Sequence, residues 1–354
     1  MANSVSAVLV TGAAGFIGSH VVDTLRRRHP NRAVVSLDAL TYAGNIDNLA
    51  TWRNDPLHHF VHADIVDRDA VRAVFDAHPI DAVLHLAAES HVDRSLVDPM
   101  AFVRTNVEGT ATLLQQARRA WGDRTDVRFV HVSTDEVFGS LGATGFFNET
   151  TPYDPKSPYS ASKAAADHLV RAFGHSYGLP VVVTNCSNNY GPRQFPEKLI
   201  PLVVTRALTG GVVPVYGQGE NVRDWLYVTD HAEALIDVLD RAEPHTTWCI
   251  GGDTAVNNLT LVHRLLDEVD SQTDKATGTS RALIRFVTDR PGHDFRYAID
   301  ASRIHGALGW RPTVDLGEGL RRTVAWMRNN PAWLERVTSG AYRDWERTWY
   351  GDRA

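Results

Sequence analysis

Two groups of side chains in this 354-residue sequence have the types and spacing needed for proton transfer. Thr134, Asp135 and Glu136 follow an apolar stretch at residues 127–132 that is expected to form a strand. Adjacent carboxyl groups repel each other's ionisation, so one of them tends to stay protonated and the pair offers an acid and a base together. The alternative interpretation is that the two acids only begin a helix in a surface loop.

Tyr159 and Lys163 form the second group. Residues four apart lie on one face of a helix, and a helix is expected over residues 159–177. The lysine ammonium is expected to lower the pKa of the phenol. The tyrosinate would then take a proton from a sugar hydroxyl as hydride leaves the same carbon. A tyrosine and a lysine four apart are common by chance, so this interpretation depends on a redox cofactor.

A glycine-rich loop near the N-terminus supplies that cofactor site. Gly12 and Gly15 follow an expected strand at 8–10, and Gly18 lies in the first turn of an expected helix at 16–28. Glycines there permit a tight turn and let the backbone approach a pyrophosphate at the helix N-terminus. Asp38 ends the next expected strand, where an acid accepts hydrogen bonds from the adenosine ribose. Its charge would repel a 2′-phosphate, so NAD is favoured over NADP. The alternative is a glycine-rich turn without a ligand.

Two further stretches are placed to contact a dinucleotide. Asp64 and Ile65 follow a short apolar segment after the second strand, where they would line an adenine pocket. Leu86, Ala87 and Ala88 close another strand with small residues, which would let a ring or a ribose pass close to the backbone.

Strands and helices alternate along the first half of the chain. The expected strands are 8–10, 33–38, 82–86, 127–132 and 181–184, and the expected helices are 16–28, 70–77, 103–120 and 159–177. Alternation with continuous Val/Leu runs predicts an α/β fold with a Rossmann-type doubly wound parallel sheet. Proline and glycine break up the chain from about residue 190. We therefore expect an NAD-binding domain at 1–190, with some later segments crossing back, and a smaller α/β substrate domain at 191–354.

Composition excludes several other classes of protein. The net charge of −6 gives no reason to expect nucleic acid as a partner. No apolar run reaches the roughly 18 residues needed to span a bilayer, and the N-terminus lacks a charged leader pattern. Cys186 and Cys249 both lie in apolar stretches, which suits a reducing compartment. We expect a soluble, cytoplasmic protein. His58, His59 and His62 lack a carboxylate or cysteine at ligand spacing, so no metal site is expected.

Several longer motifs carry a resemblance to a known family. They are Leu40–Asn45, His85–Ser95, Ser133–Val137, Asn188–Pro192, Phe195–Pro201, Val222–Trp225 and Arg290–Asp294, and they run over nearly the whole chain. With them the sequence resembles the extended short-chain dehydrogenases/reductases of the nucleotide-sugar type, and within these the members that dehydrate dTDP-glucose. Two positions depart from the pattern: Phe138 stands where tyrosine is usual, and Gly251–Thr254 lacks the usual Asn-Glu pair.

The resemblance implies roles for the proton-transfer residues. Tyr159 would act as base at the C4 hydroxyl, with Thr134 polarising that oxygen and NAD oxidising C4. Glu136 would then remove the proton at C5, which the new ketone acidifies. Asp135 would protonate the departing C6 hydroxyl before C6 is reduced. The implied product is a 4-keto-6-deoxy sugar nucleotide, and NAD would stay bound because the net oxidation is zero.

The resemblance also implies binding residues and an assembly. The nucleotide diphosphate would be held by Lys198, Leu199, Pro214, Tyr216, Arg223, Asn258 and His293, and the sugar by Ser90 and Asn188. Together with the loop residues, the expected NAD-binding set is Gly12, Gly15, Phe16, Ile17, Gly18, Asp38, Asp64, Ile65, Leu86, Ala87, Ala88, Thr105, Tyr159, Lys163 and Asn189. Members of this family commonly form homodimers through the helices expected at 103–120 and 159–177.

Three other functions share parts of this pattern. A sugar-nucleotide C4 epimerase or decarboxylase would keep Tyr159 and Lys163 but would not need the acid pair. A dehydratase could act on a UDP- or GDP-linked sugar instead, because contacts to the base depend on loop geometry. A non-catalytic NAD-binding sensor or scaffold would be expected to have lost at least one of the five catalytic candidates, which are Thr134, Asp135, Glu136, Tyr159 and Lys163, and all are present.

Overall fold

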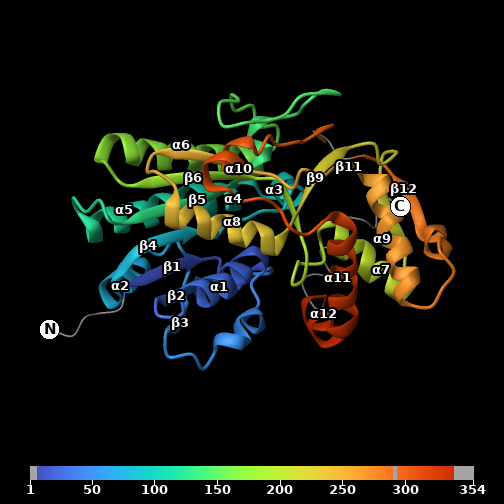
Figure 1. Cartoon of the computed structure of the whole chain (residues 1–354), viewed down its shortest axis with the longest axis horizontal. Coiled ribbons are helices and arrows are strands. Elements are labelled where there is room, and N and C mark those ends of the chain that lie inside the picture. The colour runs from blue at the N-terminus through green and yellow to red at the C-terminus, as the bar shows by residue number, and fades with distance from the viewer. Residues whose placement is uncertain (1–5, 290–292, 339–354) are drawn as a thin grey trace.

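Seven parallel strands form the central sheet in the described part of the chain (Figure 1). Their order is β10-β6-β5-β4-β1-β2-β3. Their bounds are β1 Ala7–Thr11, β2 Ala33–Asp38, β3 His58–His62, β4 Ile80–His85, β5 Arg128–Thr134, β6 Val181–Cys186 and β10 Thr246–Ile250. The structure is a computed structural model that describes residues 6–289 and 293–338. Arg290, Pro291 and Gly292 of the last family motif lie outside the described residues, as do residues 1–5 of the first predicted domain and residues 339–354 of the second.

Helices cover both faces of this sheet, and the strand sequences explain why. Val8 and Val10 of β1 pack in one core with α1 (Phe16–Arg28) and α8 (Val228–Arg241). Ala7 and Leu9 point the other way and pack with α2 (Arg68–Ala77), α5 (Thr110–Trp121) and α6 (Pro158–Tyr177). Side chains alternate between the faces of a strand, so a strand buried on both faces must be apolar throughout.

A smaller layer lies beside the sheet, on the right in Figure 1. It holds a sheet of β7 (Asn188–Tyr190), β9 (Val222–Tyr227) and β11 (Ala255–Asn257), and a pair of β8 (Val213–Tyr216) and β12 (Ile284–Val287). Its helices are α7 (Leu199–Thr209), α9 (Asn258–Gln272), α11 (Leu316–Asn329) and α12 (Pro331–Val337). The helix α10 (Ser302–Leu308) contacts β10 of the large sheet. Because β10 and α8 return to the large sheet, the layers exchange segments. The division into two domains near residue 190 stays a prediction.

The structure differs from the expected elements at several points, and two of them bear on the site and the metal prediction. The helix expected at 103–120 is divided into a π-helical segment η2 (Val103–Gly109) and α5, and α4 (Pro99–Phe102) directly precedes them. Pro99 sits in the first turn of α4, where its missing N–H costs nothing, so helix begins earlier than the apolar pattern indicated. The edge strand β3 was not predicted because its three histidines hide the apolar pattern of a strand.

Those histidines have partners within the fold. His58 lies 2.9 Å from the Ser36 hydroxyl, and His62 lies 3.1 Å from the Ala39 carbonyl oxygen. Within residues 6–289 and 293–338, no group of three or more His, Cys, Asp or Glu side chains is arranged to hold a metal ion. Across the same residues, no helix combines the length and the apolar character that crossing a membrane requires.

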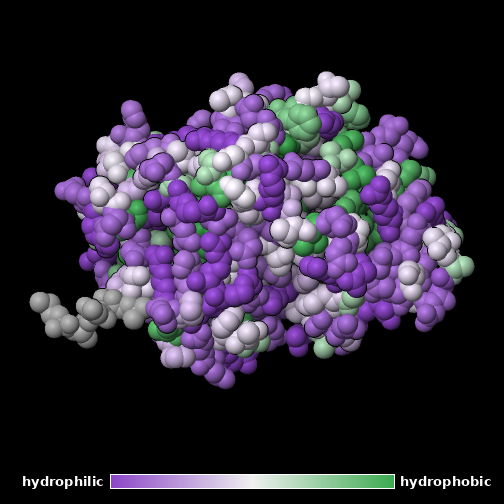
Figure 2. All heavy atoms as spheres, viewed as in Figure 1, coloured by the Kyte–Doolittle hydropathy of each residue, from purple (hydrophilic) through white to green (hydrophobic). Residues whose placement is uncertain are grey.

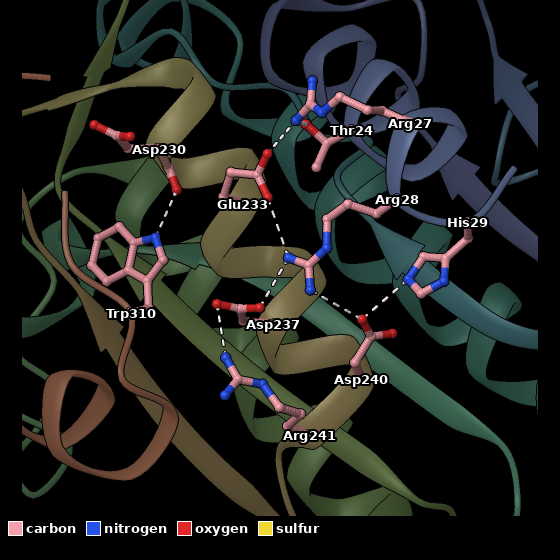
Figure 3. A network of polar contacts seen from close by, with 10 residues as sticks. All are labelled: Thr24, Arg27, Arg28, His29, Asp230, Glu233, Asp237, Asp240, Arg241 and Trp310. Atoms are coloured by element: carbon pink, nitrogen blue, oxygen red, sulfur yellow. Dashed lines mark hydrogen bonds and ion pairs between the residues drawn. The ribbon is translucent and has the colours of Figure 1, made fainter. Parts of the chain in front are cut away.

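An ion-pair network joins α8 to the end of α1 (Figure 3). Arg28 lies 2.9 Å from Asp237 and 3.4 Å from Asp240, and His29 lies 3.1 Å from Asp240. Arg27 also pairs with Glu233. Cations are favoured at the C-terminus of a helix, which accounts for the run of three arginines, Arg26–Arg28, in the last turn of α1. Figure 2 shows that the face over α1 and α8 is largely hydrophilic, so these pairs are screened by water and contribute little stability.

Candidate active site

Two adjoining cavities lie beyond the carboxyl ends of the large sheet, where open parallel sheets bind ligands. The first has a volume of about 320 Å³, and every residue expected to bind NAD lines it, as do Thr134, Asp135, Glu136 and Ser90. The second has a volume of about 160 Å³ and is lined by Leu199, Pro214, Tyr216, Arg223, Asn258 and His293. Glu136, Asn188, Glu197 and Lys198 line both. The structure therefore brings all the predicted site residues to one continuous site.

The glycine loop has the geometry of a phosphate cradle. Gly12 has a φ of 67°, and a Cβ there would come within 2.8 Å of the Ala87 backbone. A Cβ on Gly18 would lie 2.0 Å from the Gly12 carbonyl oxygen. The first turn of α1 has no capping side chain and no acidic residue, and Gly15, Phe16 and Ile17 line the cavity. Its amide N–H groups are thus available to an anion such as a pyrophosphate.

Asp38 closes the other side of this loop. Its carboxylate accepts hydrogen bonds from the Ala14 amide at 2.9 Å and the Leu40 amide at 2.8 Å. Burial raises the pKa of Asp38, and those two amides oppose the rise. A Cβ on Gly44 would lie 2.7 Å from the carboxylate, so a glycine keeps the space beside Asp38 clear. A fixed acid at this point fits the hydroxyls of a ribose and disfavours an added phosphate.

The acid pair lies at the end of β5. Thr134 caps the short 3₁₀ turn η3 (Asp135–Phe138) by accepting the Glu136 amide at 3.3 Å. Asp135 is 2% exposed, and its Oδ1 accepts a hydrogen bond from the Thr134 hydroxyl at 3.3 Å. Burial, followed by the charges of Glu136 and Asp224, raises the pKa of Asp135 well above its usual value. Burial therefore favours the protonated form of Asp135, which is the state that a general acid needs.

The raised pKa of Asp135 leads to a prediction about stability. Asp135→Asn should raise Tm at neutral pH, because the unfolded chain releases a proton that the folded chain keeps. The pKa of Asp135 is higher in the folded chain than in the unfolded chain. The free energy of unfolding of the wild type therefore falls as pH rises above about 3.9, the unfolded value. The gain in Tm should be absent near that pH and grow toward neutral pH in thermal melts. The exposed Asp154→Asn serves as the control, and a gain independent of pH would contradict the assignment.

Tyr159 and Lys163 lie at the start of α6, which is fixed by a capping box of Ser157 and Ser160 and by Pro158 in its first turn. Lys163 Nζ donates to the Val132 carbonyl oxygen at 2.9 Å.

We expected Lys163 to lower the pKa of Tyr159, and this expectation was wrong. Burial, followed by the negative charge of Glu136, raises the pKa of Tyr159 well above its ordinary value, and a hydrogen bond with Thr134 opposes this. The lysine ammonium is turned toward the backbone of β5.

The second cavity is built around Arg223. Its guanidinium donates to the Asp294 carbonyl oxygen at 2.9 Å and stacks over the Tyr297 ring at 4.1 Å. This stacking and the backbone contacts fix the orientation of a planar fork of donors, which suits a diphosphate. His293 lies 2.6 Å from Asp289, and Lys198 donates to the Ser90 carbonyl oxygen at 2.7 Å. The cavity thus collects three cationic or donor side chains beside the acid pair.

Comparison with known proteins decides the family. A family model described as GDP-mannose 4,6 dehydratase matches residues 9–323. The chain belongs to this family. It is similar to the dTDP-glucose 4,6-dehydratase of Xanthomonas campestris pv. campestris, with 52% identity over 341 residues, which are 95% of this chain and 97% of that protein.

Solved structures of the family have the same fold. A crystal structure of DesIV, a dTDP-glucose 4,6-dehydratase from Streptomyces venezuelae with NAD and TYD bound, has a TM-score of 0.86 and 45% identity, and covers 94% of this chain and 99% of that chain. A UDP-glucose 4-epimerase from Thermus thermophilus, in complex with NAD, has a TM-score of 0.81 and 33% identity, with 92% and 99% covered. These likenesses confirm the Rossmann-type fold and the resemblance to extended short-chain dehydrogenases/reductases. The fold by itself does not separate dehydratase from epimerase.

Sequence reasoning missed several residues that line the family site. Glu197 is 6% exposed, pairs with Arg94 at 2.9 Å and lines both cavities. Tyr297 forms the floor under Arg223, and Glu89 lines the first cavity. Glu197 lay inside a quoted motif, beside Lys198, so its position carried a signal. Nothing in the sequence indicated a role for Tyr297, because it comes close to Arg223 of β9 only in the folded chain.

The two departures from the family pattern have local explanations. Phe138 packs between Phe147 and Tyr153, with ring centroids 5.2 and 5.3 Å away. A buried aromatic cluster has no need of a hydroxyl at this position. Backbone amides of Gly252 and Thr254 both donate to Asp224, at 2.9 and 2.8 Å. The Gly251–Thr254 segment therefore holds an acid whose charge acts on Asp135.

Proposed function

We propose that this protein converts dTDP-glucose to dTDP-4-keto-6-deoxyglucose and water with a bound NAD. The observation that carries the proposal is the acid pair Asp135 and Glu136, which lines the same cavity as Tyr159 and Lys163. One pair suits transient oxidation of a sugar carbon and the other suits loss of water. The names of the similar proteins support dTDP-glucose as the substrate.

NAD fits the first cavity on this chain's own features. The uncapped first turn of α1 would hold the pyrophosphate, and Asp38 would hold the adenosine ribose. The small residues Ala87 and Ala88 would leave room for the nicotinamide half, next to Tyr159 and Lys163. The chemistry that the bound cofactor supplies is reversible two-electron oxidation of sugar carbon, used once in each direction.

The protein's own side chains handle the protons. Tyr159 accepts the proton of the C4 hydroxyl as a tyrosinate, a form that the Lys163 ammonium and the positive charge of a bound nicotinamide would favour against burial. The hydroxyl of Thr134 donates a hydrogen bond to the same C4 oxygen. A ketone at C4 acidifies the neighbouring C5 hydrogen, which Glu136 removes. Asp135, protonated because it is buried, gives its proton to the C6 hydroxyl as that group leaves as water. The second cavity keeps the diphosphate on Arg223, so the sugar reaches these groups from one side.

The alternatives are disfavoured by particular residues. A C4 epimerase has no task for a buried protonated acid beside a second carboxylate, so Asp135 and Glu136 argue against it. A sensor has no need for Tyr159 and Lys163 in the cavity with them. A UDP- or GDP-linked substrate is the remaining rival, because the family description names GDP-mannose. Direct comparison of the sugar nucleotides as substrates discriminates among these.

The first experiment is a mass spectrum of dTDP-glucose after incubation with purified protein and no added NAD. Loss of one water with a 4-keto product would support both the dehydratase reaction and a retained cofactor. An unchanged mass with a new sugar isomer would indicate an epimerase. No change, with NAD measured as bound, would refute dTDP-glucose as substrate, and the same assay with UDP- and GDP-sugars would follow.

We further propose that the protein is a cytoplasmic homodimer. Leu96, Val97, Met100 and Val103 are 39%, 63%, 66% and 43% exposed on α3 (Val92–Val97), α4 and η2. Four apolar side chains in so short a stretch support an interface that continues along the neighbouring helices. Both cysteines are free and buried, which suits a reducing compartment. Light scattering should give twice the chain mass of 39.2 kDa, and Met100→Lys should shift it toward one chain.

A further inference from the structure

A buried polar cluster lies behind Lys163 and has no part in the reaction described above. Asp167 follows Lys163 by one helical turn and has no exposed surface. Its Oδ1 lies 3.1 Å from Nε2 of the fully buried His131, and its Oδ2 accepts the Tyr153 hydroxyl at 2.7 Å. The amide of Asn185 donates to the same oxygen at 3.4 Å. A carboxyl group taken so far from water requires a reason to be there.

Asp167 is ionised in this setting. Burial by itself would raise the pKa of Asp167, but His131, Lys163 and the Tyr153 hydroxyl outweigh burial, and the pKa lies below its usual value. Burial, followed by the charge of Lys163, lowers the pKa of His131 to about 4, so the imidazole is neutral at pH 7. His131 therefore supplies polarity and not the counter-charge.

Lys163 is the buried cation closest to Asp167 along the chain. Burial lowers the pKa of Lys163, and the negative charge of Asp167 is the first influence that opposes the fall. The other titratable groups around Lys163 are neutral at pH 7, since burial raises the pKa of Cys186 to about 12 and of Tyr159 well above 10, and lowers that of His85. Arg171 is a second cation near Asp167. Its guanidinium donates to the Tyr153 hydroxyl at 3.0 Å, so it acts on the carboxylate through that hydroxyl and less strongly than Lys163 does.

Asn185 connects the same carboxylate to the catalytic strand. Its side-chain amide donates to the Thr134 carbonyl oxygen at 3.0 Å as well as to Asp167. Thr134 is the last residue of β5 and the cap of the turn that carries Asp135 and Glu136. Lys163 in turn donates to the Val132 carbonyl oxygen, two residues earlier on β5. The Asp167 carboxylate is thus joined to the end of β5 through Asn185, and its charge acts on Lys163 one helical turn before it.

We propose that Asp167 is a positioning residue, whose buried negative charge keeps Lys163 an ammonium ion and whose contact with Asn185 holds the end of β5 in place. The catalytic part of this inference rests on the proposed function, whereas the charge pairing does not. Removing one partner of a buried pair leaves an uncompensated charge, which is costly, whereas removing both is tolerated.

A thermal double-mutant cycle tests the pairing without any substrate. Lys163→Met should lower Tm by leaving Asp167 uncompensated. Adding Asp167→Asn to that variant should recover about half or more of the lost Tm, because the two sites couple. If the two losses simply add, the charge pair is refuted, whether or not the protein has the proposed activity.

The pH profile of dehydration tests the catalytic consequence. Asp167→Asn should move the alkaline limb of kcat/KM to lower pH by about one unit or more, because a lysine without its counter-charge loses its proton sooner. Tyr153→Phe keeps the carboxylate charge and should leave that limb in place. A loss of activity by the same factor at every pH would show a purely structural residue and overturn the proposal. Absence of activity in the wild type would refute the proposed function and leave the thermal cycle standing.

Discussion

Glu136→Gln is expected to separate the oxidation of the sugar from the loss of water. Glutamine keeps the shape of the side chain and removes its ability to accept the C5 proton. Tyr159, Thr134 and the cofactor residues are untouched, so the C4 ketone and reduced nicotinamide should still form. Loss of a general base costs about 10²–10⁴-fold in rate, and the elimination should slow by that factor.

Two readouts distinguish the steps in this variant. Stopped-flow absorbance of the reduced nicotinamide should rise on adding dTDP-glucose and then persist, while mass spectrometry finds little deoxy product. Glu220→Gln, an exposed glutamate outside both cavities, is the matched control and should turn over normally. Deoxy product at the wild-type rate would show that Glu136 is not the base at C5.

Local patterns predicted much of this site because a parallel sheet collects the ends of its strands. Gly12 follows β1, Asp38 ends β2, Leu86 follows β4 and Thr134 ends β5, so residues that close an apolar run share one edge. The bounds of α1 and β2 were also predicted correctly, since both elements end at unambiguous polar or basic residues. Strand ends carry this information without any knowledge of the fold.

What sequence could not supply depends on contacts made across the chain. The strand β10 was not expected, and it reaches the sheet only by pairing with β6 after the chain has passed through the smaller layer. The contact between the Tyr297 ring and the Arg223 guanidinium likewise joins two segments that are far apart in the sequence. The direction of the Tyr159 pKa was wrong because helical spacing says which residues share a face but not how deeply they are buried, nor that Lys163 would bond to β5.

The site also shows why its two tasks occupy one cavity. Burial keeps Asp135 protonated and raises the pKa of Tyr159, so the protein favours neutral forms of both groups. The same burial lowers the pKa of Lys163, and the negative charge of Asp167 opposes that fall. A single low-dielectric pocket therefore prepares an acid, while a separate buried carboxylate preserves the one cation that a tyrosinate would need nearby.

Tyr159→Phe should act one step earlier than Glu136→Gln. Phenylalanine keeps the ring, which packs edge-on against Phe102 with centroids 6.2 Å apart, so Tm should hold. Without the phenol the C4 proton loses its acceptor, and formation of reduced nicotinamide should slow about 10²–10⁴-fold. Phe138→Tyr, which adds a hydroxyl in the adjoining aromatic cluster, is the control for changes in packing.

The order of the two steps gives the sharper test. If Tyr159 acts before Glu136, the double variant Tyr159→Phe/Glu136→Gln should form reduced nicotinamide no faster than Tyr159→Phe, and the accumulation seen with Glu136→Gln should vanish. Non-additive losses of this kind are the signature of residues that serve successive steps of one reaction. Normal formation of reduced nicotinamide in Tyr159→Phe would instead assign the C4 proton to another group, and Thr134, which hydrogen-bonds the phenol, would be the residue to replace next.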